Sequence, residues 1–246
     1  MRLLLDLKVK KSSILLAVYL FSMFLPGFFS NQVMQIVSNI MMVGVAIYLF
    51  SVKYKPSRFM ILTICYFAYL IVITFIYHNK AADVHLIISN LKIVFMLCAI
   101  EYLLKRTPHS TINIMFFILI TFVIIDFASI VLFPNGLYQT EQIWNEWSSS
   151  QEAFWIYGNK NNRIYWYVLL SIITWLRYFF NNKSKVMVLI TSGISIVAMM
   201  LVKSSTATIV AILVSVGIFY LTYKKKTNIN MNSYGILVIY VCITVL

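Results

Sequence analysis

The residues best suited to chemistry in this 246-residue chain lie in one long polar stretch, residues 134–163, and in one short turn, residues 202–206. The stretch ends in Gly158-Asn159-Lys160-Asn161-Asn162-Arg163 and the turn reads Val202-Lys203-Ser204-Ser205-Thr206, each directly before an apolar run. A helix start offers unpaired backbone N–H groups and a positive dipole end, so it attracts anions. Asn and Ser cap such starts, while Lys and Arg add charge and bidentate hydrogen bonds. The two segments together predict a site for phosphate or pyrophosphate.

In this interpretation two cations, Arg163 and Lys203, act directly on the pyrophosphate as catalytic groups. The neighbouring polar residues would bind the substrate, namely Gly158, Asn159, Lys160, Asn161, Ser204 and Ser205. The alternative is that the cations only reach lipid head groups at the membrane surface. Their occurrence together, on the side where positive charge is scarce, strengthens the site interpretation, and both interpretations stay open.

Aromatic residues crowd the polar stretch, with Trp144, Trp147 and Trp155 as the largest. The spacing of three between Trp144 and Trp147 predicts a short amphipathic helix at the membrane interface. These rings could stack on sugars, with nearby acids taking hydroxyl groups and one acid serving as general base. The alternative is an ordinary aromatic belt at the membrane surface.

Two charged residues, Lys92 and Asp126, fall inside apolar runs, where charge is costly and often functional. Both lie about 10 Å below the outer boundary at 1.5 Å per residue. Matching depth predicts that they pair and lock two helices together. Alternatively, Asp126 bounds a water-filled pocket that opens toward the polar stretch, which makes it a third catalytic candidate.

The apolar runs that must position these groups are long enough to cross a membrane. A spanning helix needs about 17–25 apolar residues. That template predicts an all-α, polytopic membrane protein with eight complete spans, at 13–30, 33–52, 59–77, 85–104, 112–133, 164–180, 186–202 and 207–223. A ninth span begins near Gly235 and stops at residue 246, so we expect a single transmembrane domain, 1–246, truncated at its C-terminal end.

Basic residues are distributed unequally between the two sides. With the N-terminus inside, fifteen of the twenty Lys and Arg lie on the inner side and four on the outer side, while Lys92 lies within a span. Positive charge marks the cytoplasmic side. We therefore expect the N-terminus to be cytoplasmic and residues 134–163 to form a large extracytoplasmic loop.

Composition excludes several classes of protein. A chain that is 61% hydrophobic, with mean hydropathy +0.88, cannot bury its apolar surface in one soluble core. The net charge of +13 comes from small basic groups between spans, which argues against nucleic-acid binding. The Cys and His residues have no metal-ligand spacing, and no GxSxG, P-loop or HExxH motif occurs. We expect no metal and no cofactor.

Three motifs in the second half of the chain resemble those of a known family. They are Phe133-Pro134-Asn135-Gly136-Leu137-Tyr138 at the start of the loop, Gly158-Asn159-Lys160-Asn161-Asn162 before a span, and Val202-Lys203-Ser204-Ser205-Thr206 before a helix rich in small residues. In this order they resemble the Wzy-type polysaccharide and O-antigen polymerases, which share a superfamily with the O-antigen ligases.

The resemblance implies a glycosyltransferase at the outer face of the bacterial cytoplasmic membrane. Such an enzyme joins oligosaccharide repeat units carried on undecaprenyl pyrophosphate into capsular, exopolysaccharide or O-antigen chains, without nucleotide sugar. Lys160, Arg163 and Lys203 occupy the places of family basic residues that hold pyrophosphate or glycan. Implied partners are the lipid-linked oligosaccharide, the bilayer, and flippase and chain-length regulator proteins. Family members usually carry a second large outer loop, which this chain lacks.

Three alternatives stay open. An O-antigen ligase would transfer finished glycan to another acceptor. A flippase for lipid-linked oligosaccharide should show repeat symmetry and a charged midplane cavity. An inactive truncated fragment would carry no activity.

Overall fold

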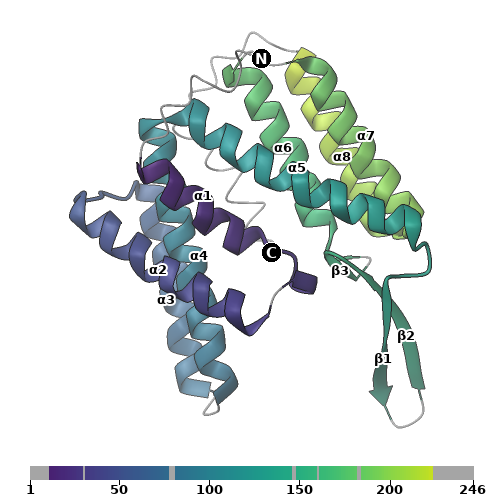
Figure 1. Cartoon of the computed structure of the whole chain (residues 1–246), viewed down its shortest axis with the longest axis horizontal. Coiled ribbons are helices and arrows are strands. Elements are labelled where there is room, and N and C mark those ends of the chain that lie inside the picture. Colours follow the sequence, from purple (N-terminus) through teal and green to yellow (C-terminus); the bar gives the residue numbers. More distant parts are fainter. Residues whose placement is uncertain are drawn as a thin grey trace. The chain divides into compact units, whose positions relative to one another are not determined.

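The computed structural model of the chain describes residues 11–29, 31–77, 81–145, 148–159, 161–181 and 184–223. It forms two compact units (Figure 1). The first comprises residues 1–23 and 31–111, and the second comprises residues 24–30 and 112–246.

Helices dominate both units, and the described residues contain eight α-helices. The first four are α1 (Lys11–Phe24), α2 (Gln32–Ser51), α3 (Arg58–Tyr77) and α4 (Ala81–Arg106), with a short 3-10 helix, η2 (Gly27–Phe29), after α1. The others are α5 (Pro108–Leu132), α6 (Ile164–Asn181), α7 (Lys185–Leu201) and α8 (Ser205–Tyr223). The helices therefore occupy the places that the eight apolar runs predicted. The partial ninth span lies outside the described residues.

Local sequence accounts for the helix boundaries. The side chains of Asn31 and Ser184 cap α2 and α7 by accepting hydrogen bonds from backbone N–H groups. Pro108 occupies the first position of α5, where its missing N–H costs nothing. The first predicted span, 13–30, is too long, because α1 already ends at Phe24, two residues before Pro26.

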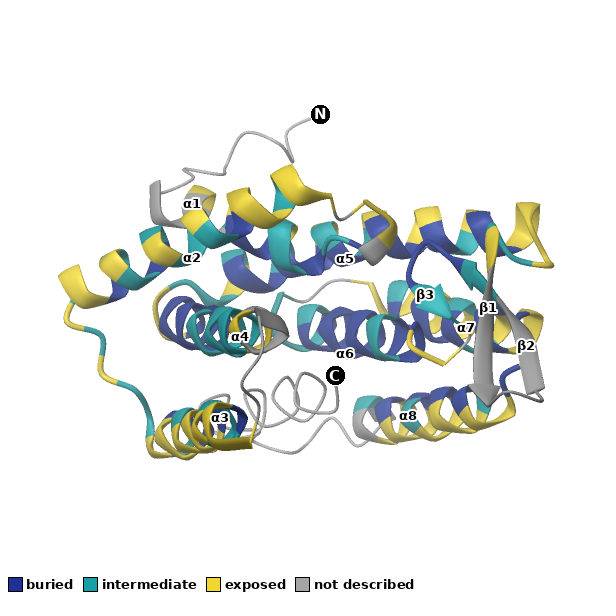
Figure 2. Ribbon diagram, turned by 90° about the horizontal axis from the view of Figure 1, so that it is seen from below, coloured by how far each residue is buried: buried dark blue, intermediate teal, exposed yellow. Residues whose placement is uncertain are grey.

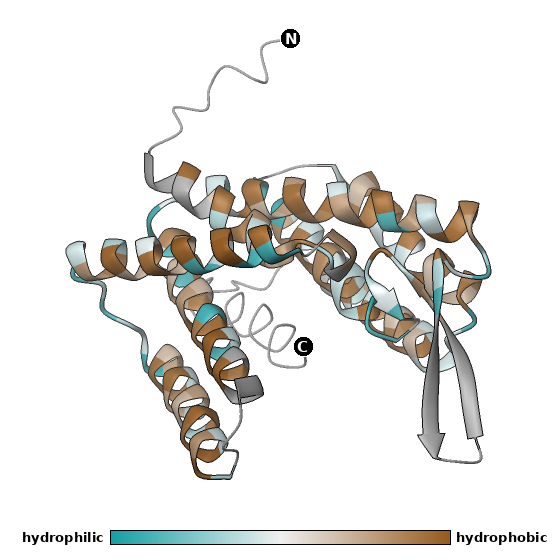
Figure 3. Cartoon of the chain, turned by 60° about the horizontal axis from the view of Figure 1, so that its bottom comes forward, coloured by the Kyte–Doolittle hydropathy of each residue, from teal (hydrophilic) through white to brown (hydrophobic). Residues whose placement is uncertain are grey.

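Four of the described helices are long and apolar enough to cross a membrane. These segments are Gln32–Ser51, Arg58–Tyr77, Leu86–Arg106 and Pro108–Leu132. The apolar helices at Lys185–Leu201 and Ser205–Tyr220 are shorter. Hydrophobic residues also cover outward faces of the helices (brown in Figure 3). The chain is thus a membrane protein. Within the described residues, the four full-length helices are fewer than the eight complete spans that the sequence predicted.

Helix α6 is the core of the second unit. Its residues from Tyr167 to Leu176 are all buried, whereas α7 and α8 each keep an exposed face (Figure 2). The three helices pack against one another. A helix buried on every side can hold hydroxyl-bearing residues that a lipid-facing helix would not favour. This explains why the sequence of α6 is less apolar than those of α7 and α8.

A β-hairpin includes Trp144, one of the two residues at which a short amphipathic helix was predicted, whereas Trp147 lies outside the described residues. Strand β1 (Tyr138–Asn145) pairs antiparallel with β2 (Ser148–Trp155), and a short β3 (Gly158–Asn159) pairs with β2. Tyr138 lies opposite Phe154, and the two rings stack with centroids 5.3 Å apart. The helix prediction was wrong because aromatic and β-branched residues also favour strands, and cross-strand ring pairs stabilise a hairpin.

In the first unit, α2 and α3 both pack on α4. The Tyr19 hydroxyl of α1 donates a hydrogen bond to the Lys92 carbonyl oxygen of α4, at 2.8 Å. Glu101 near the end of α4 is only 1% exposed and binds the connection between α2 and α3. These contacts hold the four helices of the unit together.

Candidate functional site

The centre of the candidate site is Asp126, a carboxylate in α5 that is 0% exposed. Its Oδ1 accepts a hydrogen bond from the Tyr157 backbone N–H at 2.9 Å, and its Oδ2 accepts one from the Tyr167 hydroxyl at 2.9 Å. Arg163 Nη1 lies 3.6 Å from the same Oδ2. Asp126 therefore connects α5, the loop before α6, and the first turn of α6.

Arg163 is also 0% exposed, and its guanidinium is used inside the protein. Nη2 donates to the Gly158 carbonyl oxygen at 2.8 Å and Nε donates to that of Asn159 at 3.3 Å. Its Cζ lies 4.4 Å from the centre of the Trp155 ring, a cation–π distance. Burial lowers the pKa of Arg163, and the adjacent Asp126 charge opposes that shift. In this arrangement the Arg163 side chain stabilises the turn that begins at Gly158 and ends at Arg163.

Trp155 completes this buried layer. It is 3% exposed, and its Nε1 donates to the Phe133 carbonyl oxygen at 2.7 Å. The indole thus ties the end of β2 to the end of α5. Its ring, which the sequence indicated as a stacking surface for sugar, carries the Arg163 guanidinium instead.

Two donors in this layer have no hydrogen-bond acceptor among the described residues, namely Arg163 Nη1 and the Tyr157 hydroxyl. The Tyr157 ring stacks on Trp166 with centroids 5.0 Å apart. Burial, together with the Asp126 charge, raises the pKa of Tyr157, so its hydroxyl stays protonated. The layer therefore retains unused capacity to donate hydrogen bonds.

The turn next to this layer contains Gly158, Asn159, Asn161 and Asn162, and we call it the asparagine turn. Gly158 adopts φ +96°, which favours glycine, and Asn159 Oδ1 accepts from the backbone N–H groups of Asn161 (3.2 Å) and Asn162 (2.9 Å). The Ser204 hydroxyl donates to Asn161 Oδ1 at 2.9 Å. This bond joins the start of α6 to the start of α8.

Lys203 occupies the position after α7 that glycine usually fills. Its φ is +55°, its N–H donates to the Met200 carbonyl oxygen at 3.0 Å, and the Ser204 N–H donates to that of Met199 at 3.2 Å. This pattern is a Schellman motif with lysine in the left-handed position. Lys203 is exposed, while Ser204 beside it is buried. The strained turn thus presents an exposed ammonium next to the asparagine turn.

The structure brings together most of the residues that the sequence singled out, but in two layers. One layer is the asparagine turn, with Gly158, Asn159 and Asn161, to which Ser204 is hydrogen-bonded. Beside it, at the start of α8, two residues are exposed, Lys203 and Ser205. The other layer is buried and consists of Asp126, Arg163 and Trp155. Trp144 lies on β1, and its side chain is not among those described. Lys160 and Trp147 lie outside the described residues.

Asp126 has a cation partner in its own unit, Arg163, which sequence reasoning did not assign to it; Lys92, the predicted partner, belongs to the other unit. Sequence reasoning also gave no contact with Asp126 to Tyr157 and Tyr167, which both bind the carboxylate. Tyr167 follows Arg163 by four positions, so the helical repeat could have placed both on one face of α6.

The asparagine turn before α6 and the Lys203 turn before α8 bring two helix starts together through the Ser204–Asn161 hydrogen bond. Within the described residues, no group of three or more His, Cys, Asp or Glu side chains is placed to hold a metal ion. Comparisons with protein-family models, with curated proteins and with solved structures give no match.

Proposed function

We propose that this protein is a glycosyltransferase that joins oligosaccharide repeat units carried on undecaprenyl pyrophosphate, at the outer face of a bacterial cytoplasmic membrane. In the reaction, a hydroxyl oxygen of one unit bonds to the anomeric carbon of the growing chain. The bond from that carbon to the pyrophosphate oxygen breaks, the hydroxyl proton passes to a base, and undecaprenyl pyrophosphate leaves with the electron pair.

The observation that carries the proposal is the hydrogen bond between Ser204 and Asn161. It joins two helix starts, each of which attracts anions, and places the exposed Lys203 beside the turn from Gly158 to Arg163. A pyrophosphate leaving group carries its charge on oxygens, which a cation and backbone N–H groups stabilise without a metal. Support also comes from the motif order that resembles the polymerase family.

The two layers have different roles in this proposal. Lys203 meets the pyrophosphate, with Asn161 and Ser204 shaping the site. Arg163 and Asp126 are positioning residues, because their charged groups are buried and hold the turn. Lys160 stays a predicted pyrophosphate ligand.

The test is a pair of substitutions at Lys203, introduced at the gene's own locus. Lys203→Gly removes the ammonium but suits the left-handed turn, where an L-residue costs about 1–2 kcal/mol, so the variant should fold at least as stably. We expect long polymer to disappear while single lipid-linked units accumulate. Lys203→Arg keeps a cation and should retain polymer.

Other outcomes would distinguish the alternatives. Unchanged polymer length in Lys203→Gly would refute the assigned role. Polymer that is still made on the lipid but no longer attached to its final acceptor would identify a ligase. Failure of units to reach the outer leaflet would identify a transporter.

A further inference from the structure

A second cationic surface lies in the first unit, on residues that the proposed transferase site does not use. We define the basic end as Lys53, Lys55, Arg58, Lys105 and Arg106, all of which are exposed. The first three belong to the connection between α2 and α3 and the start of α3, and the last two end α4. The charge distribution of the sequence predicts that this end is cytoplasmic.

Buried contacts hold the parts of the basic end together. Glu101, one turn before the end of α4, accepts hydrogen bonds from the Tyr54 hydroxyl and from the Ser57 backbone N–H, the latter at 3.1 Å. Its Oε1 also lies 2.5 Å from Lys105 Nζ. A single buried carboxylate thus fastens the α2–α3 connection to the last turn of α4. It offsets only one of five positive charges.

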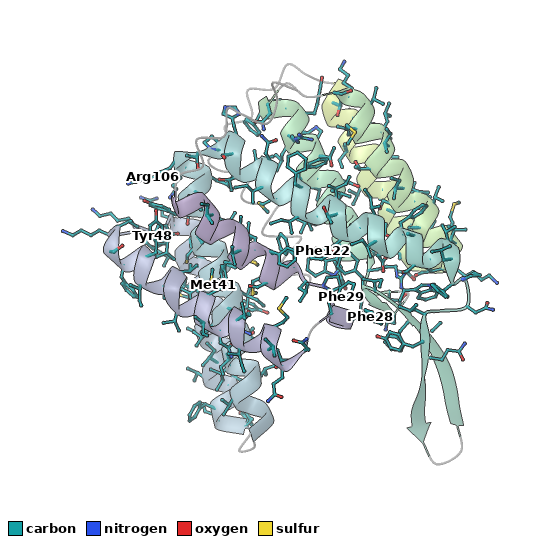
Figure 4. All side chains as sticks on the ribbon, viewed as in Figure 1. Phe28, Phe29, Met41, Tyr48, Arg106 and Phe122 are labelled. Atoms are coloured by element: carbon teal, nitrogen blue, oxygen red, sulfur yellow. The ribbon has the colours of Figure 1, made fainter. Side chains whose placement is uncertain are left out.

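Aromatic contacts also fix the position of Arg106. Its Cζ lies 4.8 Å from the centre of the Tyr102 ring, and Tyr102 makes edge contacts with Tyr48 (5.8 Å) and Tyr54 (6.2 Å). Tyr48 and Arg106 lie at the same end of the unit in Figure 4. Rings of this kind favour the membrane–water interface, at the level of lipid head groups.

Lys53 is held in the same kind of turn as Lys203. Its φ is +49°, its N–H donates to the Phe50 carbonyl oxygen at 3.0 Å, and the Tyr54 N–H donates to that of Leu49 at 3.0 Å. This is again a Schellman motif with lysine where glycine is usual. The strained turn leads directly into Tyr54, whose hydroxyl binds Glu101. Both ends of the connection are therefore ordered before any ligand binds.

We propose that the basic end is a binding site for the head groups of anionic phospholipids, such as phosphatidylglycerol, in the cytoplasmic leaflet. Phosphodiester oxygens accept hydrogen bonds from Lys and Arg, and Arg can bind two of them at once. The preorganised scaffold distinguishes this site from scattered basic residues, because Glu101 and Tyr102 hold the α2–α3 connection and the end of α4 together, and both segments carry cations. The proposal is independent of the transferase function.

The test measures lipid bound to the purified protein by native mass spectrometry, with phosphatidylglycerol and phosphatidylcholine as probes. Each cation removed should weaken phosphatidylglycerol binding about fivefold. Lys53→Gly should therefore lose about fivefold, and the triple variant Lys53→Gly, Lys55→Gln, Arg58→Gln should lose about a hundredfold. Phosphatidylcholine binding should not change.

Lys185→Gln is the control, since it removes one exposed cation from α7, outside both the basic end and the proposed transferase site. It should leave phosphatidylglycerol binding unchanged. An equal loss in Lys185→Gln and Lys53→Gly would show a general effect of charge and overturn the proposal. Binding of an acidic peptide at the basic end, without preference for phosphatidylglycerol, would also overturn it.

Discussion

The pairing of Asp126 with Arg163 predicts strong coupling between two buried residues. Asp126→Asn keeps the shape of the side chain but leaves the Arg163 charge buried without its counter-charge. Breaking one partner of a buried pair costs about 3–5 kcal/mol. The value should fall near 3 kcal/mol here, because Arg163 keeps its bonds to the Gly158 and Asn159 carbonyl oxygens and its contact with Trp155.

The assay is a double-mutant cycle with Arg163→Met, which removes the cation at similar length. Unfolding free energies would be measured in detergent by titration with denaturing detergent, using tryptophan fluorescence. The double variant should cost about 1.5–3 kcal/mol less than the sum of the two single variants, as expected for residues in one network. Asp126 and Arg163 belong to the same unit, so the cycle reports on one cooperative structure.

A control pair separates coupling from general damage. Ser171 is also buried on α6, but among the described residues its hydroxyl donates a hydrogen bond to the Tyr167 carbonyl oxygen alone. It lies about 12 Å along the helix from Arg163. Ser171→Ala with Arg163→Met should be additive. Additivity within about 0.5 kcal/mol for Asp126→Asn with Arg163→Met would refute the assigned role of the pair.

Two further substitutions test local features of each unit. Gly136→Ala should destabilise the base of the hairpin by about 1–3 kcal/mol, because φ is +99° and the new Cβ would lie 2.9 Å from Ala153 Cβ. Gly44→Ala is the control, since its new Cβ would meet nothing within 4 Å. Equal melting temperatures for the two variants would contradict this prediction. Tyr54→Phe should cost about 1.5–3 kcal/mol of unfolding free energy, because it removes a hydrogen bond to the Glu101 carboxylate. It should also speed proteolysis between α2 and α3. An unchanged cleavage rate would count against a role of Tyr54 in holding this connection.

The helices could be predicted from the sequence because each apolar run is long and is bounded by prolines, capping residues or charges. The end of α1 was missed, although Pro26 marks it. The hairpin was missed for a different reason. Trp144 and Trp147 fit a helical spacing, but the cross-strand pairs between β1 and β2, which begin with Tyr138 opposite Phe154, outweigh local spacing. Such pairing is visible only in three dimensions.

The candidate site was predicted in composition but not in arrangement. Sequence reasoning identified Arg163, Asp126 and Lys203 from charge and position, and it had no means of deciding which of them is buried. Burial depends on the segment between β2 and α6 packing against α5, where the Tyr157 backbone N–H and Arg163 both contact Asp126. The left-handed turn at Lys203 was equally invisible, since lysine is an unusual residue there.

The most direct test of the proposed transferase function uses protein purified from its own host and reconstituted in vesicles with labelled undecaprenyl-pyrophosphate-linked repeat units. We expect long glycan to form without nucleotide sugar, with one undecaprenyl pyrophosphate released for each unit added, and we expect Lys203→Gly to abolish both products. Labelled units that cross the bilayer without joining would contradict the account.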